Sequence, residues 1–286
     1  MKGKFKIAVS TMNFARTHFI EYAIDKIAQI GFEGIEFMGN RPYFDPAECT
    51  QKDIEKVRNL LEKYNLPCVS VTTNDGSFHW CLSSPYDAVR NATINHIKKA
   101  IELAKELGAK IVESESGPGR IIEDDPVEEW KRTVDAYKEL ADYAAKYDVV
   151  IGQECSRNPL VRESHVTETT KDSIRMVKDV ASKNIGVLLD TAHAGQEPFM
   201  AIPEAIELAA PYLVHMHTSD SPLTHHEHLP FGMGKVNWDA VVGTLNKIGY
   251  DKWVTVELGF CPDPIGEVSK ALKILKKYRD EDFYAK

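Results

Sequence analysis

Residues 185–190 read IGVLLD, and the rest of the chain repeats the pattern of this short segment. It is a run of aliphatic residues closed by one acidic residue, without the polar alternation of a half-exposed strand. Such a run is typical of a strand that is buried on both faces, as in a parallel sheet. The segments 149–154 (VVIGQE), 213–217 (LVHMH) and 253–257 (WVTVE) are likewise short and mostly apolar, and each also ends in a polar residue.

Apolar runs of this kind alternate with longer amphipathic stretches along the whole chain. We predict eight strands, at Phe5–Ser10, Gly34–Phe37, Leu66–Thr72, Ala109–Glu113, Val149–Glu154, Ile185–Asp190, Leu213–His217 and Trp253–Glu257. Strict alternation of strands and helices implies parallel pairing through right-handed crossovers. Eight such units can close into a (β/α)8 TIM barrel, and a doubly wound open sheet is the alternative arrangement.

The helical stretches carry their own start and stop signals. In Asn91–Leu107 the apolar residues recur as one stripe at helical spacing, and Gly108 then ends the helix. Pro126 opens the next helix, where its missing N–H group costs little. The length of 286 residues suits one barrel, and no linker divides the chain, so we predict a single domain over residues 1–286.

The composition restricts the possible partners. The formal net charge is −8, which disfavours a general affinity for nucleic acid or an anionic membrane. No apolar run reaches the length of a membrane span, and the N-terminus lacks the apolar core of a signal peptide. The five cysteines form no Cys-x-x-Cys pair, so we expect a reducing, cytoplasmic location.

Four successive predicted strands end in a carboxylate or an imidazole: Glu154, Asp190, His217 and Glu257. In a TIM barrel the carboxyl ends of the strands form one rim, and active sites lie there. Three carboxylates close together repel one another and are costly to desolvate, and a divalent cation removes both problems. Oxygen ligands with one imidazole favour Mn²⁺, Mg²⁺ or Co²⁺, with Zn²⁺ also possible. The alternative for each carboxylate alone is a helix cap or a salt-bridge partner.

Half of the ten histidines lie within His215–His228, which favours metal or substrate chemistry in this segment. His215 shares a strand face with His217, and we interpret it as a packed, hydrogen-bonded histidine rather than a ligand. His225 and His226 are interpreted as solvated loop residues. His96 falls in the middle of an amphipathic helix and is predicted to be structural.

The segments IGVLLDTAHA, HMHTSD, HEHLPFGMGKVNW and VTVELGF resemble the sugar isomerase/epimerase superfamily of xylose-isomerase-like barrels. The resemblance implies that Glu154, Asp190, His217 and Glu257 bind one divalent metal ion. In the ketose 3-epimerase members, the two glutamates also exchange protons with the substrate carbon. His193 is implied to contact substrate oxygens, and His228 matches a histidine that often precedes the family's Gly-x-Gly loop.

Other residues at the rim are candidates for shaping the substrate pocket. Glu36 ends the second strand and could bind a substrate hydroxyl or form an internal salt bridge. Of Glu113 and Glu115 we expect only one to face the barrel, with Glu115 as the candidate for substrate binding. His79 and Trp80 follow the third strand, and Trp80 either forms a wall against the sugar or simply covers the barrel mouth.

The resemblance implies a metal-dependent sugar epimerase or isomerase that abstracts a proton to give a metal-stabilised enediolate. Whether epimerisation or aldose–ketose isomerisation follows is left open. The alternatives are a dehydratase of an inosose-like or dehydroshikimate-like substrate and a non-catalytic sugar-binding barrel. The endonuclease IV branch of the scaffold needs further histidines after strands 3 and 4, which the segments VSVTTNDG and IVESESG lack. The expected partner is a small sugar or polyol, and association of identical chains is possible.

Overall fold

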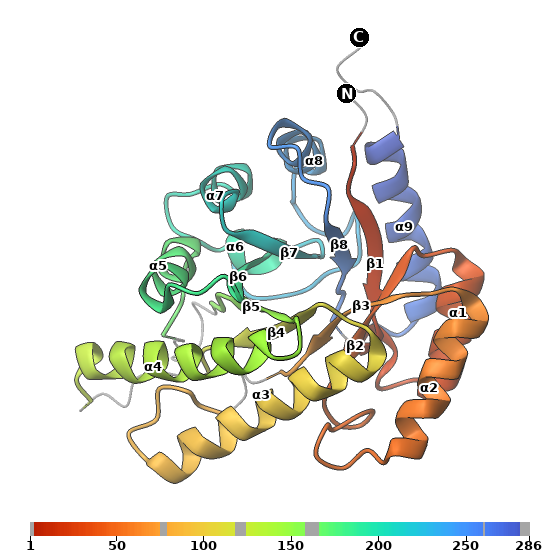
Figure 1. Ribbon diagram of the computed structural model, residues 1–286. Helices are drawn as coiled ribbons and strands as arrows, with labels where there is room; N and C mark the ends of the chain where they lie inside the picture. The colour runs from red at the N-terminus through yellow and green to blue at the C-terminus, as the bar shows by residue number, and fades with distance from the viewer. Residues whose placement is uncertain (1–2, 75–78, 118–123, 158–165, 260, 281–286) are drawn as a thin grey trace.

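The strands close on themselves into a barrel around which the helices are arranged (Figure 1). The computed structural model describes residues 3–74, 79–117, 124–157, 166–259 and 261–280. Within these residues, eight strands pair in chain order, every pair is parallel, and β8 returns to β1. The strands are β1 Lys6–Ser10, β2 Gly34–Met38, β3 Cys68–Thr72, β4 Ile111–Glu115, β5 Val150–Glu154, β6 Ile185–Asp190, β7 Leu213–Thr218 and β8 Trp253–Val256. The predicted TIM barrel is confirmed.

Most strand boundaries agree with the prediction within two residues, and β6 agrees at both ends. The fourth strand differs most, because β4 runs to Glu115 rather than ending at Glu113. Its polar end stays in the sheet because it pairs with β5, with Glu115 opposite Glu154. The eighth strand ends earlier than predicted: β8 ends at Val256, so Glu257 is the first residue beyond the strand.

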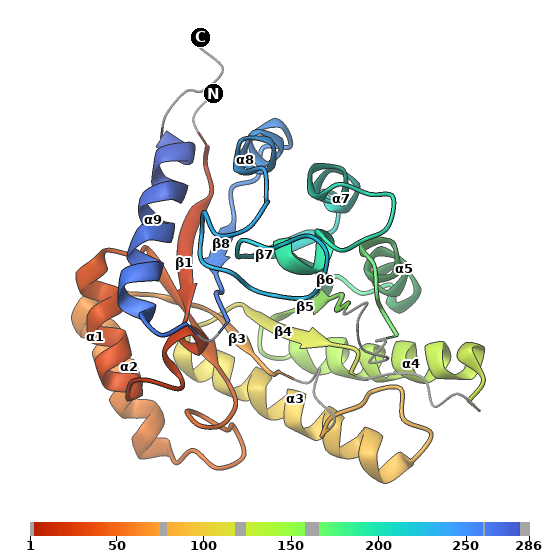
Figure 2. The same ribbon diagram turned by 180° about the vertical axis from the view of Figure 1, so that it is seen from behind.

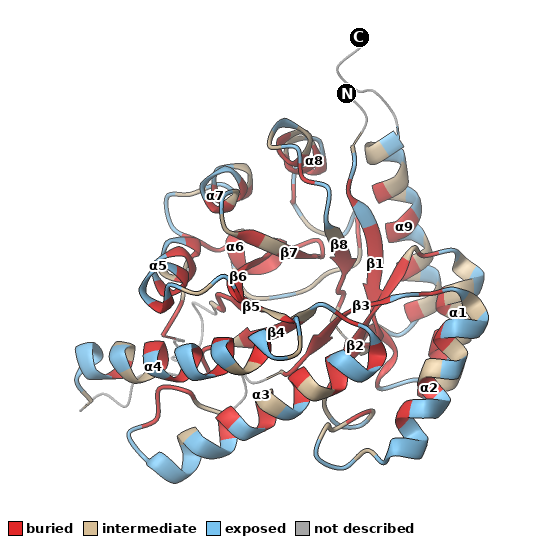
Figure 3. Ribbon diagram, viewed as in Figure 1, coloured by how far each residue is buried: buried red, intermediate tan, exposed pale blue. Residues whose placement is uncertain are grey.

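The helices form the outer layer. They are α1 Ile20–Ile30, α2 Gln51–Tyr64, α3 Asp87–Leu107, α4 Pro126–Ala145, α5 Thr170–Val180, α6 Thr191–Ala194, α7 Ile202–Ala209, α8 Trp238–Lys247 and α9 Pro264–Asp280. The long helices bury one face against the strands and expose the other (Figure 3). Among the described helices, none has the length and apolar character that crossing a bilayer requires.

The predicted helix signals are found in the structure. Gly108 follows α3 in the left-handed region at φ 80°, which glycine adopts without the clash of a Cβ atom. Pro126 is the first residue of α4, and the side chain of Asp125 accepts a hydrogen bond from the backbone N–H of Val127. The helix α3 begins at Asp87, four residues before the predicted start at Asn91.

The carboxyl ends of the strands meet at one end of the barrel, which we call the rim. Figure 2 shows the loop between β7 and α8 passing across this end of the barrel. The short helix α6 lies at the same end, directly after β6. The fold therefore brings the residues after β5, β6, β7 and β8 to one place.

Candidate metal centre and active site

Glu154, Asp190, His217 and Glu257 converge at the rim. Glu154 and Asp190 are the last residues of β5 and β6, and His217 is the penultimate residue of β7. The Nδ1 atom of His217 lies 3.1 Å from Oε2 of Glu257 and 3.6 Å from Oε1 of Glu154. Ligand atoms of Glu154, Asp190 and His217 all lie within 4.8 Å of one another. The structure thus brings together the four residues that the strand ends singled out.

Three atoms of this group are buried without a hydrogen-bond partner among the described residues: Oε1 of Glu154, Oδ2 of Asp190 and Nδ1 of His217. A buried polar atom without a partner costs free energy, so a cluster of such atoms indicates a missing ligand. Carboxylate oxygens with one imidazole nitrogen are a donor set for Mn²⁺, Mg²⁺ or Co²⁺. The residues therefore fit one divalent cation.

The pKa values of these groups are shifted because several ionisable side chains are buried close together at the rim. Burial raises the pKa of Glu154 well above its ordinary value, and the nearby Asp190 and Glu257 add to this, whereas His217 opposes it. Burial lowers the pKa of His217, but the carboxylates of Glu257, Glu36 and Glu154 outweigh burial and raise it. Without a metal, the cluster thus holds protons to offset its negative charge, and a cation would take their place.

Asp190 caps a helix with one carboxylate oxygen, and its other oxygen has no hydrogen-bond partner among the described residues. Its Oδ1 atom accepts hydrogen bonds from the backbone N–H groups of Ala192 at 2.6 Å and His193 at 3.0 Å. This oxygen caps α6, while Oδ2 is the atom without a partner. Because the cap fixes the carboxylate, it also fixes the direction of the second oxygen.

Glu36 lies directly behind His217 and has no exposed surface. Its Oε2 atom accepts hydrogen bonds from Nε2 of His217 at 2.9 Å, Nε2 of His215 at 3.2 Å and Oγ of Ser70 at 2.6 Å. Burial alone would raise the pKa of Glu36, but attraction to His217 and the hydrogen bonds from both histidines hold it below its ordinary value. The side chain is therefore placed as an internal anion beneath the imidazoles.

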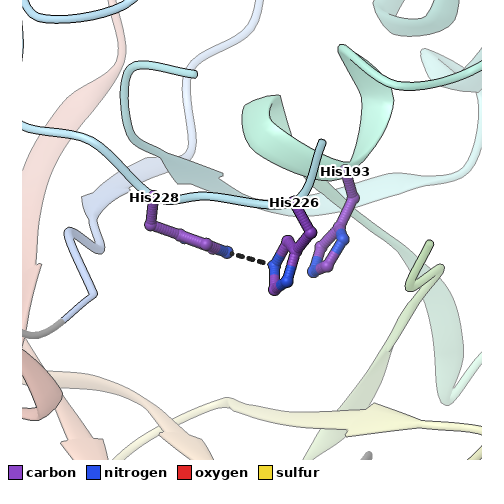
Figure 4. Close-up of side chains that lie close together, drawn as sticks. All are labelled: His193, His226 and His228. Atoms are coloured by element: carbon purple, nitrogen blue, oxygen red, sulfur yellow. Dashed lines mark hydrogen bonds between the residues drawn. The ribbon is translucent and has the colours of Figure 1, made fainter. Parts of the chain in front are cut away.

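Three further imidazoles lie next to this centre, from His193 on α6 and from His226 and His228 on the loop after β7 (Figure 4). The rings of His193 and His226 stack with centroids 4.5 Å apart and an interplanar angle of 14°. The Nε2 atoms of His226 and His228 are 2.9 Å apart. Nδ1 of His228 lies 3.1 Å from the backbone oxygen of Glu257, which connects the cluster to the metal centre.

Comparison with known proteins assigns the chain to a family. Residues 24–278 match the family described as "Xylose isomerase-like TIM barrel". The chain belongs to the xylose isomerase-like TIM barrel family. This match covers most of the chain and agrees with the resemblance seen in the strand-6 and strand-7 segments.

Relatives of this xylose isomerase-like barrel include epimerases and a dehydratase. It is 25% identical over 243 residues to the fructoselysine 3-epimerase of Shigella flexneri, covering 84% of this chain and 85% of that protein. It is 23% identical to the inosose dehydratase of Lacticaseibacillus casei, over 91% of this chain and 88% of that one. A solved D-tagatose 3-epimerase-like protein superposes with a TM-score of 0.83 and 25% identity, covering 96% and 97% of the two chains.

Of the remaining predicted site residues of this xylose isomerase-like barrel, Glu113 and Glu115 lie beside Glu154, whereas His79 and Trp80 lie in the segment between β3 and α3. Glu113 and Glu115 both approach Glu154, with carboxylate oxygens of all three within 4.8 Å, so the expectation that only one faces the barrel is wrong. Residues two apart in a strand share a face, which is the physical reason. His79 is exposed, and Trp80 stacks on the buried ring of His96 with centroids 4.2 Å apart.

Asp220, which is not among the residues predicted from the sequence, shapes the loop after β7. Asp220 accepts hydrogen bonds from the backbone N–H groups of Ser221 at 2.9 Å, Gly232 at 2.8 Å and Val236 at 3.0 Å. It also exchanges two backbone hydrogen bonds with Leu229. The only sequence signal for this role is its position just after β7, before a glycine-containing loop.

A second missed residue, Asn13, holds the end of β8. Its Nδ2 atom donates to the backbone oxygens of Ser10 at 2.6 Å and Val256 at 3.0 Å. Its Oδ1 atom accepts from the backbone N–H of Leu258 at 2.7 Å. Asn13 therefore fixes the backbone on both sides of Glu257, although a lone asparagine after the first strand carries no recognisable signal.

Proposed function

We propose that this chain is a divalent-metal-dependent ketose 3-epimerase. The observation that carries the proposal is that Glu154 and Glu257 both lie beside one imidazole atom, Nδ1 of His217, at 3.6 and 3.1 Å. The two carboxylates come from β5 and from the end of β8, with β6 and β7 between them in the barrel. They can therefore approach a bound substrate from two sides, as inversion of one carbon requires.

In this proposal Glu154, Asp190, His217 and Glu257 hold the cation. Bound there, the ion would act as a Lewis acid that polarises the substrate carbonyl and so acidifies the neighbouring C–H group. Mn²⁺ is the first ion to test, because oxygen-rich donor sets with one imidazole suit it.

A reducing, cytoplasmic location fits the five cysteines, each of which is a free thiol.

The two glutamates carry the proton transfers. One carboxylate removes the proton from C3 on one face of the substrate, and the other delivers a proton to the opposite face. His193 lies beside the centre on α6, and we place it and His228 against substrate oxygens. Glu115 lies close enough to Glu154 to contact a hydroxyl of the same substrate.

Dehydration of a cyclic polyol ketone is the second candidate, and the similarity to an inosose dehydratase favours it. Both reactions begin with removal of a proton next to a carbonyl. They differ in the next step, in which a β-hydroxyl leaves instead of a proton returning. The residues that would hold the metal and take the first proton are the same for both.

Deuterium incorporation separates the candidates. The Mn²⁺-loaded protein would be incubated in D₂O with free ketoses such as tagatose, with fructoselysine and with inosose. Deuterium at C3 together with appearance of the C3 epimer supports the proposal. A new ultraviolet band from inosose without deuterium in any ketose favours dehydration. Binding without exchange or loss of water would identify a sugar-binding barrel and overturn both.

A further inference from the structure

Of the four candidate metal ligands, Glu257 alone lies beyond the end of its strand. The other three lie within β5, β6 and β7, whereas β8 ends at the residue before Glu257. A buried side-chain amide lies at this point, that of Asn13, which is 2% exposed. We propose that Asn13 is a positioning residue, which sets where the Glu257 carboxylate lies and leaves Glu154 unaffected. This inference rests on the proposed function, in which the two glutamates transfer protons on opposite faces of the substrate.

The register between β1 and β8 ends just before Glu257. Its last pair is Val9 with Val256, so Ser10 would come next, opposite Glu257. In a parallel pair the hydrogen bonds between the strands are evenly spaced. If the ladder continued by one step, the backbone N–H of Leu258 would donate to the backbone oxygen of Ser10.

The Asn13 amide is inserted between these two backbone groups. Its Oδ1 atom accepts the N–H of Leu258 at 2.7 Å, and its Nδ2 atom donates to the backbone oxygen of Ser10 at 2.6 Å. The same Nδ2 atom also donates to the backbone oxygen of Val256 at 3.0 Å. One side-chain amide thus takes the place of a direct hydrogen bond and separates the ends of β1 and β8.

These contacts use every donor of the asparagine side chain. An amide offers two N–H groups and a carbonyl oxygen, and all of them have a backbone partner here. A carboxylate of the same shape would keep the acceptor and lose both donors, and an aliphatic side chain would lose all three bonds. The residue type at position 13 therefore matches the backbone groups on either side of Glu257.

A short 3-10 helix brings the amide to this place. It is η1 Thr11–Phe14, which directly follows β1. The Oγ1 atom of Thr11 accepts the backbone N–H of Met38 at 2.8 Å, so the helix is also attached to the end of β2. The amide of Asn13 is therefore held by the fold itself, before any substrate binds.

The backbone of Glu154 is held in a different way. It is the last residue of β5 and pairs with Glu115 on β4 and with Leu188 on β6, so the sheet fixes it on both sides. The backbone N–H of Glu257 donates to the backbone oxygen of Thr218 at 3.0 Å, on the β7 side. On the other side the connection to β1 runs through the inserted amide. A change at position 13 should therefore displace one proton carrier and not the other.

Isotope exchange on the two faces of the substrate tests the proposal. The unaltered chain, Asn13→Asp and Glu257→Gln would be incubated at saturating Mn²⁺ in D₂O with tagatose and with sorbose, its C3 epimer. Deuterium at C3 is followed by nuclear magnetic resonance. In Asn13→Asp, exchange of the epimer that Glu257→Gln fails to exchange should fall by about 10–100-fold, because a small misplacement of a catalytic group has effects of this size. Exchange of the other epimer, through Glu154, should remain as in the unaltered chain.

A second variant and a control separate the lost amide from other effects. Asn13→Leu has a similar shape and no charge, and it should show the same loss for one epimer. Asn91→Asp, at an exposed position of α3, is the matched control and should exchange both epimers normally. An equal fall for both epimers, or no fall for either, overturns the proposal. Loss of the fold in both Asn13 variants, seen by circular dichroism, would assign Asn13 a structural role and overturn it as well.

Metal affinity gives a measurement that does not require turnover. If the unaltered chain exchanges neither epimer, the proposed function fails, and Asn13 can still be tested through Glu257 as a metal ligand. Calorimetry should then show Mn²⁺ binding weakened by about 10-fold in Asn13→Leu, because groups that orient a ligand affect metal affinity on this scale. Asn91→Asp should bind Mn²⁺ as the unaltered chain does. Unchanged affinity in Asn13→Leu would overturn the proposal.

Discussion

Nε2 of His217 lies 2.9 Å from Oε2 of Glu36, while Nδ1 of the same ring lies 3.1 Å from Oε2 of Glu257. With a cation bound, the buried Glu36 would accept the Nε2 proton of His217 and so leave the lone pair on Nδ1 for the metal. A carboxylate behind a metal-binding imidazole sets its tautomer, orients its ring and raises its basicity. Glu36 on β2 thereby sets the tautomer and the orientation of the candidate ligand His217 on β7.

The first prediction concerns this pair. Glu36→Gln replaces the anion with a neutral amide, which can turn its NH₂ group toward the imidazole and favour the wrong tautomer. We expect the affinity for Mn²⁺ to fall by about 10–100-fold, measured by calorimetry. Glu55→Gln, on an exposed position of α2, is the control and should bind as the unaltered chain does. Equal affinity in both variants would show that Glu36 only fills space.

The second prediction separates the two proton carriers. The variants Glu257→Gln and Glu154→Gln each lack one carboxylate. The rate of epimerisation should fall by at least about 100-fold in each of them. Each should still exchange the C3 proton of one epimer with D₂O, through the glutamate that is left. The two variants should therefore prefer opposite epimers, as nuclear magnetic resonance would show. Metal content is measured in parallel, and loss of exchange from both epimers in a metal-loaded variant contradicts the two-sided mechanism.

The third prediction concerns metal removal. A chelator should lower the melting temperature, because an ion present at 100 times its dissociation constant stabilises the folded state by about 2.7 kcal/mol. In Glu154→Gln the metal-dependent shift should shrink. The metal-free form of this variant should melt no lower than the metal-free unaltered chain, because the amide removes a buried carboxyl whose pKa is raised. A variant that melts lower in both states would assign Glu154 a packing role instead.

The fourth prediction concerns the carboxylate that organises the loop after β7. Asp220→Asn turns an acceptor-only group into one with an NH₂ facing backbone donors. We expect the unfolding free energy to drop by about 1–3 kcal/mol and amide hydrogens of residues 221–236 to exchange faster. Asp135→Asn, at an exposed position of α4, is the matched control. If the amide hydrogens of the loop exchanged at an unchanged rate, Asp220 would not be the group that stabilises the loop conformation.

The fifth prediction is a pH dependence of stability at Glu197. Burial raises the pKa of this carboxyl, which accepts hydrogen bonds from the backbone N–H and side-chain hydroxyl of Thr170. The folded state therefore retains the proton on Glu197 to a higher pH than the unfolded state does. The stability from this group is full below the ordinary carboxyl pKa, about 4.3, and is lost as the pH rises through the folded value.

Glu197→Gln keeps the hydrogen-bond acceptor and removes the ionisation. Relative to the unaltered chain, this variant should gain stability between pH 4 and pH 7, as followed by urea unfolding. A difference between the two proteins that does not change with pH would contradict the assignment.

The barrel and its rim could be predicted because both follow from local patterns. A buried parallel strand is a short apolar run, and a polar residue at its end is conspicuous, as Asp190 after IGVLL shows. The end of β4 could not be found in this way. Its polar residues read as a loop, and only pairing with β5 keeps Glu115 in the sheet.

Contacts between distant segments account for what the sequence missed. Glu36 and His217 are 181 residues apart, so nothing local reveals their hydrogen bond. His226 looks like a solvated loop residue, but the fold places its ring on His193. Its burial depends on the conformation of the loop, which Asp220 sets through residues up to 16 positions away.

The Asp220 hydrogen bonds have a consequence for how such a barrel can change over time. The loop from Ser221 to Val236 folds back on a single carboxylate, because the backbone N–H groups at both of its ends donate to Asp220, two residues after β7. Its two ends are thus joined through one residue, although His226 and His228 within it also contact His193 and Glu257. A related barrel that received this segment together with its aspartate would inherit the imidazoles as a unit.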